Sequence, residues 1–368
     1  MTTRARDLGI PFEGSPGRHG AVTDVAGVEV GFATIVKGRG RRGGRRGPAR
    51  TGVTVVFPRG RASRDSVMAG AAVLNGNGEM TGMAWVEEGG FLDGPIAITN
   101  THSVGVVRDA IIDWQGRRRR VPRVNQVTSE LYFTLPVVAE TADGRLNDMN
   151  AFHVKPAHVF RALDGARGGP VAEGNVGGGT GMICHGWKGG TGTASRVTAA
   201  GHTVGVLVQA NHGRAALLTV AGVPLGAELR PPPAVIPGLA EGAGSIIAVV
   251  ATDAPLLPHQ LRRIARRVSL GVGRTGGLGE NSSGDLFIAF STANPEVAAA
   301  EGVARIDALP NRAIDPLFEA TVQATEEAIV NAMVAAETMT GADGITIEAI
   351  PHRAIRRLLR RHGRLTAR

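Results

Sequence analysis

Short apolar runs alternate along this chain with longer segments of helical periodicity. Most of the runs are rich in Val and Ile, which favour strands, and are bounded by Gly, Pro or polar residues. The sequence predicts strands at 51–58, 96–100, 135–140, 203–211, 245–252, 285–292 and 344–350. Near-continuous apolar strands of this kind are typical of sheets that are covered on both faces.

The segments between these runs predict amphipathic helices at 102–114 and 258–270 and a long helix at 314–339. In 258–270 the residues Leu261, Ile264 and Val268 fall on one helical face. Gly341 is placed to cap the end of the long, Ala- and Glu-rich helix. No internal repeat is present, and strands that alternate with helices favour an α/β fold with helices packed on sheets.

The segment 230–244 (RPPPAVIPGLAEGAG) differs from its surroundings because Pro and Gly make it a poor helix and a poor strand. It stops directly before Ser245, the first residue of a predicted strand. By composition alone an ordinary surface loop explains this segment equally well.

Composition supports a compact globular chain, because 43% of its 368 residues are hydrophobic. The net charge of +9 is confined to two segments, 37–50 and 352–368, which together carry +14 and leave −5 for the remaining residues. We interpret these segments as a solvated Gly/Arg loop and an arginine-rich terminal helix. Binding to nucleic acid or to an anionic surface is the alternative.

Several classes of protein are not indicated. No apolar stretch is long enough to span a bilayer, and the first residues lack a signal-peptide core. The single cysteine, Cys184, excludes an internal disulfide and fits a reducing compartment, so we expect a cytoplasmic protein without a membrane partner. Cys184 lies in an apolar stretch and is expected to be a core residue.

Familiar site motifs are also missing. The chain has no P-loop, no H-E-x-x-H, no Cys pair and no G-x-S-x-G, and the glycine-rich run 174–192 does not match G-x-G-x-x-G. His153 and His158 have no third ligand nearby. The sequence therefore predicts neither a metal site nor a cofactor.

The remaining candidate chemistry is Ser245, preceded by Gly244, together with Ser283 and Asp285 at the start of a later strand. A serine hydroxyl needs a base, and no histidine adjoins these serines. If the chain were cut before Ser245, the new α-amine, with a pKa of about 7.7–8.0, could serve as that base. Gly244 could adopt a strained backbone that exposes its carbonyl to attack. These residues alone leave this as one hypothesis among several.

A resemblance strengthens that hypothesis. The chain resembles peptidase family S58, also called the P1 family, which includes L-aminopeptidase/D-esterases and β-peptidyl aminopeptidases. Long stretches carry the resemblance, among them TNTHSVGVVRDA (99–110), EGNVGGGTGM (173–182), LVQANHG (207–213), GSIIAVVATDAPLLPHQL (244–261) and SSGDLFIAFSTAN (282–294). Further matches cover 4–31, 50–60 and 136–148.

The resemblance implies that Ser245 is the nucleophile and that a single domain, 1–368, is cut after Gly244 into chains 1–244 and 245–368. It implies a relay in which Asp285, a position where some members have glutamate, orients Ser283, and Ser283 bonds to the nucleophile or its amine. Asn211 would stabilise the oxyanion. The alternatives are a strand-end contact for Asp285, a turn serine at 283 and a turn cap at Asn211.

The same resemblance implies that Glu140 holds the free amine of the substrate, whereas the alternative is a structural pair with an arginine. Ala142 stands where one characterised type has an oxyanion-site tyrosine, which implies a more open acyl pocket or an oxyanion hole completed by backbone N–H groups.

The implied fold is a four-layer α/β/β/α sandwich, similar to the N-terminal nucleophile hydrolases but differently connected, assembled as a homotetramer of cleaved protomers. The implied activity is release of N-terminal amino acids from peptides, amides or esters through an acyl-enzyme, without a cofactor. An acyltransferase of the ornithine-acetyltransferase type is a second hypothesis, although that group uses threonine. An uncleaved scaffold and a nucleic-acid-binding protein are the others. The preferred amino acid stays open.

Overall fold

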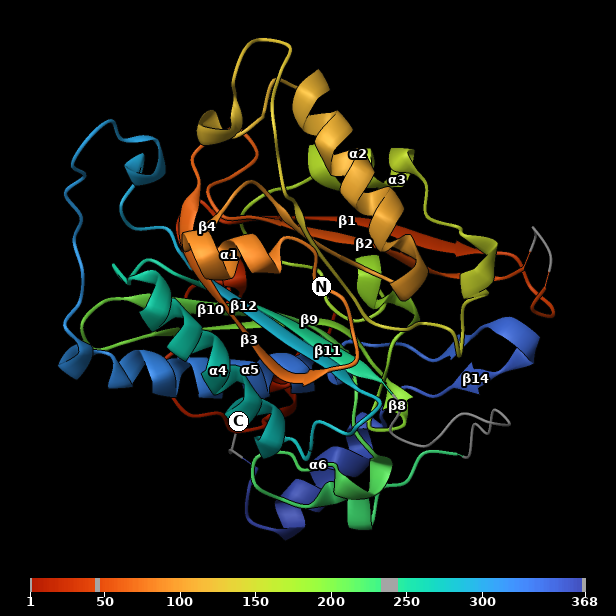
Figure 1. Ribbon diagram of the computed structural model, residues 1–368. Coiled ribbons are helices and arrows are strands. Elements are labelled where there is room, and N and C mark those ends of the chain that lie inside the picture. Colours follow the sequence, from red (N-terminus) through yellow and green to blue (C-terminus); the bar gives the residue numbers. More distant parts are fainter. Residues whose placement is uncertain (1, 44–46, 233–243, 366–368) are drawn as a thin grey trace.

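A computed structural model describes residues 2–43, 47–232 and 244–365 (Figure 1). Two sheets form its centre. The smaller has the order β1-β2-β5-β6, and the larger has the order β4-β3-β12-β11-β10-β9. The smaller contains β1 (Glu29–Lys37), β2 (Ala49–Phe57), β5 (Ile96–Thr99) and β6 (Val137–Glu140). The larger contains β3 (Val67–Gly76), β4 (Phe91–Leu92), β9 (Gly190–Val197), β10 (Thr203–Asn211), β11 (Ser245–Thr252) and β12 (Gly284–Ser291).

Helices cover the outer faces of both sheets, as Figure 1 shows. Helices α2 (Val104–Arg117) and α3 (Pro156–Asp164) pack on the four-stranded sheet, and α4 (Pro258–Arg274) and α5 (Asp315–Val334) pack on the six-stranded sheet. Helices α1 (Met83–Gly89) and α6 (His352–Arg361) lie outside these pairs. The layer order is the predicted α/β/β/α.

Alternating residues of the central strands enter different cores, which explains why these strands are apolar throughout. In β11, Ile246 and Val250 belong to the core shared with α4 and α5. Ile247 and Val249 belong to the core between the two sheets. Because both faces of β11 are covered, no polar residue interrupts the apolar run 246–251. The predicted bounds of β10 and β11 match the observed ones.

Strands β1, β3 and β9 were not predicted, and in β3 and β9 small residues with low strand propensity weaken the signal. The fold requires those small residues. A Cβ atom on Gly70 of β3 would lie 2.4 Å from the Arg262 nitrogen of α4, and one on Gly192 of β9 would lie 2.0 Å from the Ala328 oxygen of α5. The residues that weaken the strand signal therefore allow the helices to approach the sheet.

Three elements depart from the prediction, two of them in the C-terminal third. Helix α5 ends at Val334, where the Val334 carbonyl accepts a hydrogen bond from Nε2 of His352 at 2.8 Å, and Gly341 does not cap it. The strand predicted at 344–350 is only β14 (Thr346–Ile347), which pairs with β13 (Met339–Thr340). The strand predicted from residue 135 begins at Val137.

The arginine-rich segments are partly structural rather than solvated. Arg42 forms an ion pair with Asp343 at 2.6 Å. The guanidinium of Arg50 donates hydrogen bonds to the carbonyls of Thr340 and Lys37. Parts of these segments lie outside the described residues, namely 44–46 and 366–368. The same holds for 233–243 of the Pro/Gly segment. Across the described ranges, no helix combines the length and apolarity needed to cross a membrane.

Candidate active site

Ser245 is the first residue of β11 and lies between two neighbouring strand ends. It pairs with Asn211 of antiparallel β10 on one side and with Gly284 of parallel β12 on the other. The Gly284 N–H donates a hydrogen bond to Ser245 Oγ at 3.1 Å. Ser245 is 5% exposed, so the hydroxyl is held in a largely water-excluded position at the end of an inner strand.

Gly244 is buried against the backbone of β10. A Cβ atom at this position would lie 1.8 Å from the carbonyl oxygen of Asn211, so only glycine fits. The φ of Gly244 is not in the left-handed region. Close packing is therefore the observed reason for glycine at this position, and a strained backbone there stays a prediction.

Asp285 and Ser283 form a connected pair beside Ser245. Ser283 Oγ donates to Asp285 Oδ1 at 2.6 Å, and the Ile246 N–H donates to the same oxygen at 3.2 Å. Burial raises the pKa of Asp285 to about 6. Within the described ranges no hydrogen bond joins Ser283 to Ser245. The Ser283–Asp285 pair acts on Ser245 through two backbone N–H groups, that of Gly284, which binds Ser245 Oγ, and that of Ile246, which binds Asp285. Asp285 also pins the start of β12 to β11, as the structural alternative predicted.

Two asparagines that the sequence analysis did not select hold the turn before β12. Asn77 Nδ2 donates to the Ser282 carbonyl at 2.9 Å, and Asn75 Nδ2 donates to the Asn281 carbonyl at 3.2 Å. The β3–β12 pairing is irregular at Asp285, where a bulge changes the register. The Asn-Gly-Asn-Gly run at 75–78 indicates a turn, but its partner is visible only in the fold.

The Asn211 amide is fixed in orientation. Its Oδ1 accepts the Ile183 N–H at 2.8 Å, and its Nδ2 donates to the Ala142 carbonyl at 3.0 Å. These partners fix which of the two terminal side-chain atoms is the oxygen, because the atom that faces the Ile183 N–H must be an acceptor. These contacts use one of the two amide N–H groups of Asn211, which pairs with Ser245 across β10 and β11. Ala142 is exposed and contributes its backbone carbonyl.

Glu140 ends β6 with a buried carboxylate that has only neutral partners. Oε1 accepts the Glu79 N–H at 3.1 Å, and Oε2 accepts the Thr101 hydroxyl. Of the Arg and Lys residues described by the structure, none pairs with Glu140, so the arginine pair expected as the alternative is not observed. Burial raises the pKa of the carboxyl group. Among the described residues Glu140 thus forms no ion pair with Arg or Lys, and the nearby His102 imidazole is the ionisable group that favours its charged form.

Glu140 lies close to the Ser245 neighbourhood. A Cβ atom on Gly78 would lie 3.2 Å from Glu140 Oε1 and 3.0 Å from Gly284 Cα, so the Gly78 backbone fits between them. Gln209, which was not predicted, ties the sheets together here by donating to the Thr99 carbonyl at 3.0 Å. The structure therefore gathers all the predicted site residues where the two sheets meet.

Comparison with known proteins identifies the family to which this arrangement belongs. The model of peptidase family S58 matches residues 20–347. The chain belongs to peptidase family S58. The chain is therefore a hydrolase, a serine aminopeptidase of the N-terminal nucleophile type.

The S58 chain is similar to two proteins called β-peptidyl aminopeptidase BapA. One, from Sphingosinicella microcystinivorans, is 53% identical over 99% of this chain and 93% of its own. The other, from Sphingosinicella xenopeptidilytica, is 50% identical over 97% of this chain and 91% of its own. The fold is similar to L-aminopeptidase D-Ala-esterase/amidase from Ochrobactrum anthropi, with a TM-score of 0.90, 49% identity and 99% coverage of both chains. That structure is described as a variant of the Ntn hydrolase fold, which confirms the predicted fold class.

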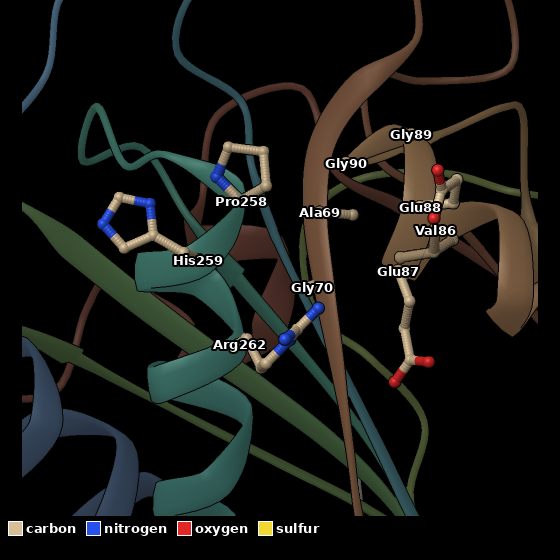
Figure 2. A pocket seen from close by; sticks show the side chains of 10 residues that line it. All are labelled: Ala69, Gly70, Val86, Glu87, Glu88, Gly89, Gly90, Pro258, His259 and Arg262. Carbon is tan, nitrogen blue, oxygen red and sulfur yellow. The ribbon is translucent and has the colours of Figure 1, made fainter.

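A separate cavity of about 350 Å³ lies between α1 and the start of α4. Figure 2 shows Pro258, His259 and Arg262 on one side of it, Glu87 and Glu88 on the other, and Gly70 of β3 between them. Gly70 is about 20 Å along β3 from Gly76, which pairs with Gly284 next to the nucleophile position. This S58 chain therefore places its candidate catalytic groups away from the cavity.

Proposed function

We propose that this S58 aminopeptidase activates itself by cutting the Gly244–Ser245 bond and then uses Ser245 as an N-terminal nucleophile. One observation carries the proposal. Ser245 starts the central strand β11, and its neighbours on the two sides are Asn211 of β10 and the start of β12. The Asn211 amide has a second N–H to donate, and β12 begins beside the hydrogen-bonded pair of Ser283 and Asp285. The products would be the chains 1–244 and 245–368 of one domain.

In the self-cleavage step, Ser245 Oγ attacks the Gly244 carbonyl carbon and the peptide C–N bond breaks. The acyl group moves to oxygen, the hydroxyl proton moves to the Ser245 nitrogen, and that nitrogen becomes a free amine. Water then hydrolyses the ester and restores the hydroxyl. Close packing of Gly244 on the Asn211 carbonyl supports this step, because it restricts where the scissile carbonyl lies.

In turnover, the free α-amine of Ser245 takes the proton from Oγ as it attacks the first carbonyl of the substrate. The second N–H of Asn211 stabilises the tetrahedral oxyanion. The proton passes to the leaving amine, and water hydrolyses the acyl-enzyme. Asp285 and Ser283 orient the start of β12, whose Gly284 N–H binds the hydroxyl.

Glu140 supplies the exopeptidase selectivity. A protonated substrate amine can provide the cationic partner that this buried carboxylate lacks, whereas an internal peptide N–H cannot. The proposed substrates are peptides, amides or esters with a free N-terminal amine. The β-peptidyl and D-Ala-ester activities in the names of the relatives suggest β-amino acid and D-alanine derivatives as the first to assay.

Exposed apolar side chains support the further proposal of a homotetramer of cleaved protomers. Val127, Leu131, Phe133 and Leu135 are all near or above half exposed in one segment, which Figure 1 shows projecting beside α2. Such a cluster is typical of an interface. Light scattering of the processed protein tests this proposal. A cytoplasmic location is also proposed and is tested by cell fractionation.

The deciding experiment is intact mass spectrometry of the purified, denatured protein, with Ser245→Ala as the comparison. We expect two fragments that meet between Gly244 and Ser245, and an uncut, inactive Ser245→Ala chain. A single 38.1 kDa species with full aminopeptidase activity would refute self-processing. An active Ser245→Ala variant would refute the nucleophile.

A further inference from the structure

Three side chains with metal-binding atoms meet in a buried cluster that the peptidase mechanism does not use. They belong to Cys184, His185 and His212, and one candidate ligand atom from each lies within 4.8 Å of the other two. Cys184 Sγ is 3.9 Å from His212 Nδ1. The two imidazole rings meet edge to face with centroids 5.3 Å apart. None of the three residues is more than 4% exposed.

Both imidazoles in this cluster carry an unpaired polar atom. The Nε2 atoms of His185 and His212 are buried without a hydrogen-bond partner. An unpaired buried polar group costs about 1–3 kcal/mol, and native cores contain few of them. His185 Nε2 is therefore open to a ligand, and His212 faces the Cys184 sulfur through its other nitrogen, Nδ1.

The hydrogen bonding of His185 fits that role. Its Nδ1 lies 3.1 Å from the Arg214 carbonyl oxygen, which only accepts, so Nδ1 carries the proton and Nε2 keeps its lone pair. Metal-binding histidines almost always donate their second N–H to a carbonyl or carboxylate in this way.

The donor set and its spacing suit one class of ion. One sulfur and two imidazole nitrogens are ligands that zinc and similar divalent transition metals accept. In a tetrahedral zinc site the sulfur and nitrogen atoms are about 3.5 Å apart, so the 3.9 Å separation needs a shift of only a few tenths of an ångström.

We propose that Cys184, His185 and His212 bind a zinc-type divalent ion. Each ion that binds forms a sulfur–metal bond and releases the thiol proton of Cys184 to solvent. The residues come from β7 (Ile183–Cys184), the turn after it, and the residue that follows β10.

The position of the site gives the ion a structural role near the nucleophile. Ile183, directly before Cys184, donates to Asn211 Oδ1, and the His185 N–H donates to the His212 carbonyl at 2.8 Å. An ion would cross-link the two segments that fix the Asn211 amide. This consequence rests on the proposed function of Asn211, whereas the metal site itself does not.

The test uses the full-length chain, unfolded with a chelator and refolded with Co²⁺ as a probe, because the buried cluster must be filled before the fold closes. We expect about one cobalt per chain, a near-ultraviolet thiolate-to-cobalt band and a higher Tm than in the metal-free chain. Cys184→Ser should lose the band and bind cobalt at least about tenfold more weakly. None of these readouts depends on aminopeptidase activity, so the two proposals fail separately.

Two histidine variants and one control complete the design. His185→Phe and His212→Phe keep a ring in the core and should fold without binding cobalt, whereas His259→Gln, on α4, should bind it normally. A wild-type chain with less than about a tenth of an ion per chain, or a cobalt spectrum unchanged in Cys184→Ser, would overturn the proposal. If refolding fails, the zinc content of protein purified from zinc-supplemented cells decides between the same outcomes.

Discussion

Asn211 lies directly opposite Ser245 in the antiparallel pairing of β10 with β11. Residues paired in this way have Cβ atoms about 4.5–5.5 Å apart and point to the same face of the sheet. The backbone register therefore sets the distance between the amide and the hydroxyl, and neither side chain needs to be on a flexible loop.

Asn211→Asp should lower kcat about 10²–10³-fold with little change in KM. The carboxylate keeps the acceptor for the Ile183 N–H but cannot donate to an oxyanion. Steady-state kinetics on aminoacyl-p-nitroanilides measure this loss. Asn294→Asp, on an exposed loop, is the matched control. A kcat within about threefold of wild type would remove Asn211 from the oxyanion site.

Gly244→Ala should block or greatly slow self-cleavage, because its Cβ would lie 1.8 Å from the Asn211 carbonyl oxygen. Intact mass measured over several days after purification follows the reaction. Gly105→Ala is the control, since a Cβ on this helical glycine meets nothing within 4 Å and should add about 0.5–1 kcal/mol of stability. Normal processing of a folded Gly244→Ala chain would show that the space around residue 244 is not critical.

The sequence predicted most of the central strands because their β-branched runs are unbroken, but it missed features that depend on contacts between distant segments. Asn75 and Asn77 are informative only because their turn meets residues 281–283. Helix α5 stops where His352 reaches the Val334 carbonyl, and nothing in residues 335–341 signals that end. Likewise, Cys184 and His212 are adjacent in space because β7 runs beside the end of β10, so a search by ligand spacing passed over them.

Glu140→Gln should reduce kcat/KM about 100-fold for substrates with a free amine, because the amide keeps the shape and removes the charge. The kcat/KM for an N-acetylated analogue should not fall, so the ratio of kcat/KM for the free amine to that for the analogue should decrease. Glu88→Gln is the control, since Glu88 is exposed on α1 and lines the separate cavity. Equal losses for both substrates would argue against amine binding at Glu140.

The activity should rise with pH through about 6, because burial raises the pKa of Asp285 to that value and the ionised carboxylate is the stronger acceptor for Ser283 and Ile246. A second rise with a pKa of about 7.7–8.0 should report the α-amine. Asp285→Asn should remove the rise near pH 6 from the pH–rate profile and reduce kcat about 10²-fold. Asp285→Glu, which keeps a carboxylate, should retain most of the activity. A rise near pH 6 that persists in Asp285→Asn would assign it to another group.

Lys188 links stability to pH, because it is fully buried and, among the described residues, its ammonium donates to two neutral groups, the carbonyls of Met182 and Gly189. Burial lowers its pKa to about 7 from 10.5. Below about pH 7 the lysine is charged in both the folded and the unfolded chain, so this group adds no slope there. Between about pH 7 and its unfolded pKa, the unfolded chain binds a proton that the folded chain does not, so stability rises with pH.

Lys188→Met removes this titration and keeps the length of the side chain. The free energy of unfolding of the wild type should therefore gain about 2 kcal/mol on that of Lys188→Met between pH 7 and pH 9. Chemical denaturation at several pH values measures the difference, with the exposed Lys155→Met as the control. A difference that stays constant across this range would mean that Lys188 keeps an ordinary pKa, and that its two carbonyl partners compensate fully for burial of the charge.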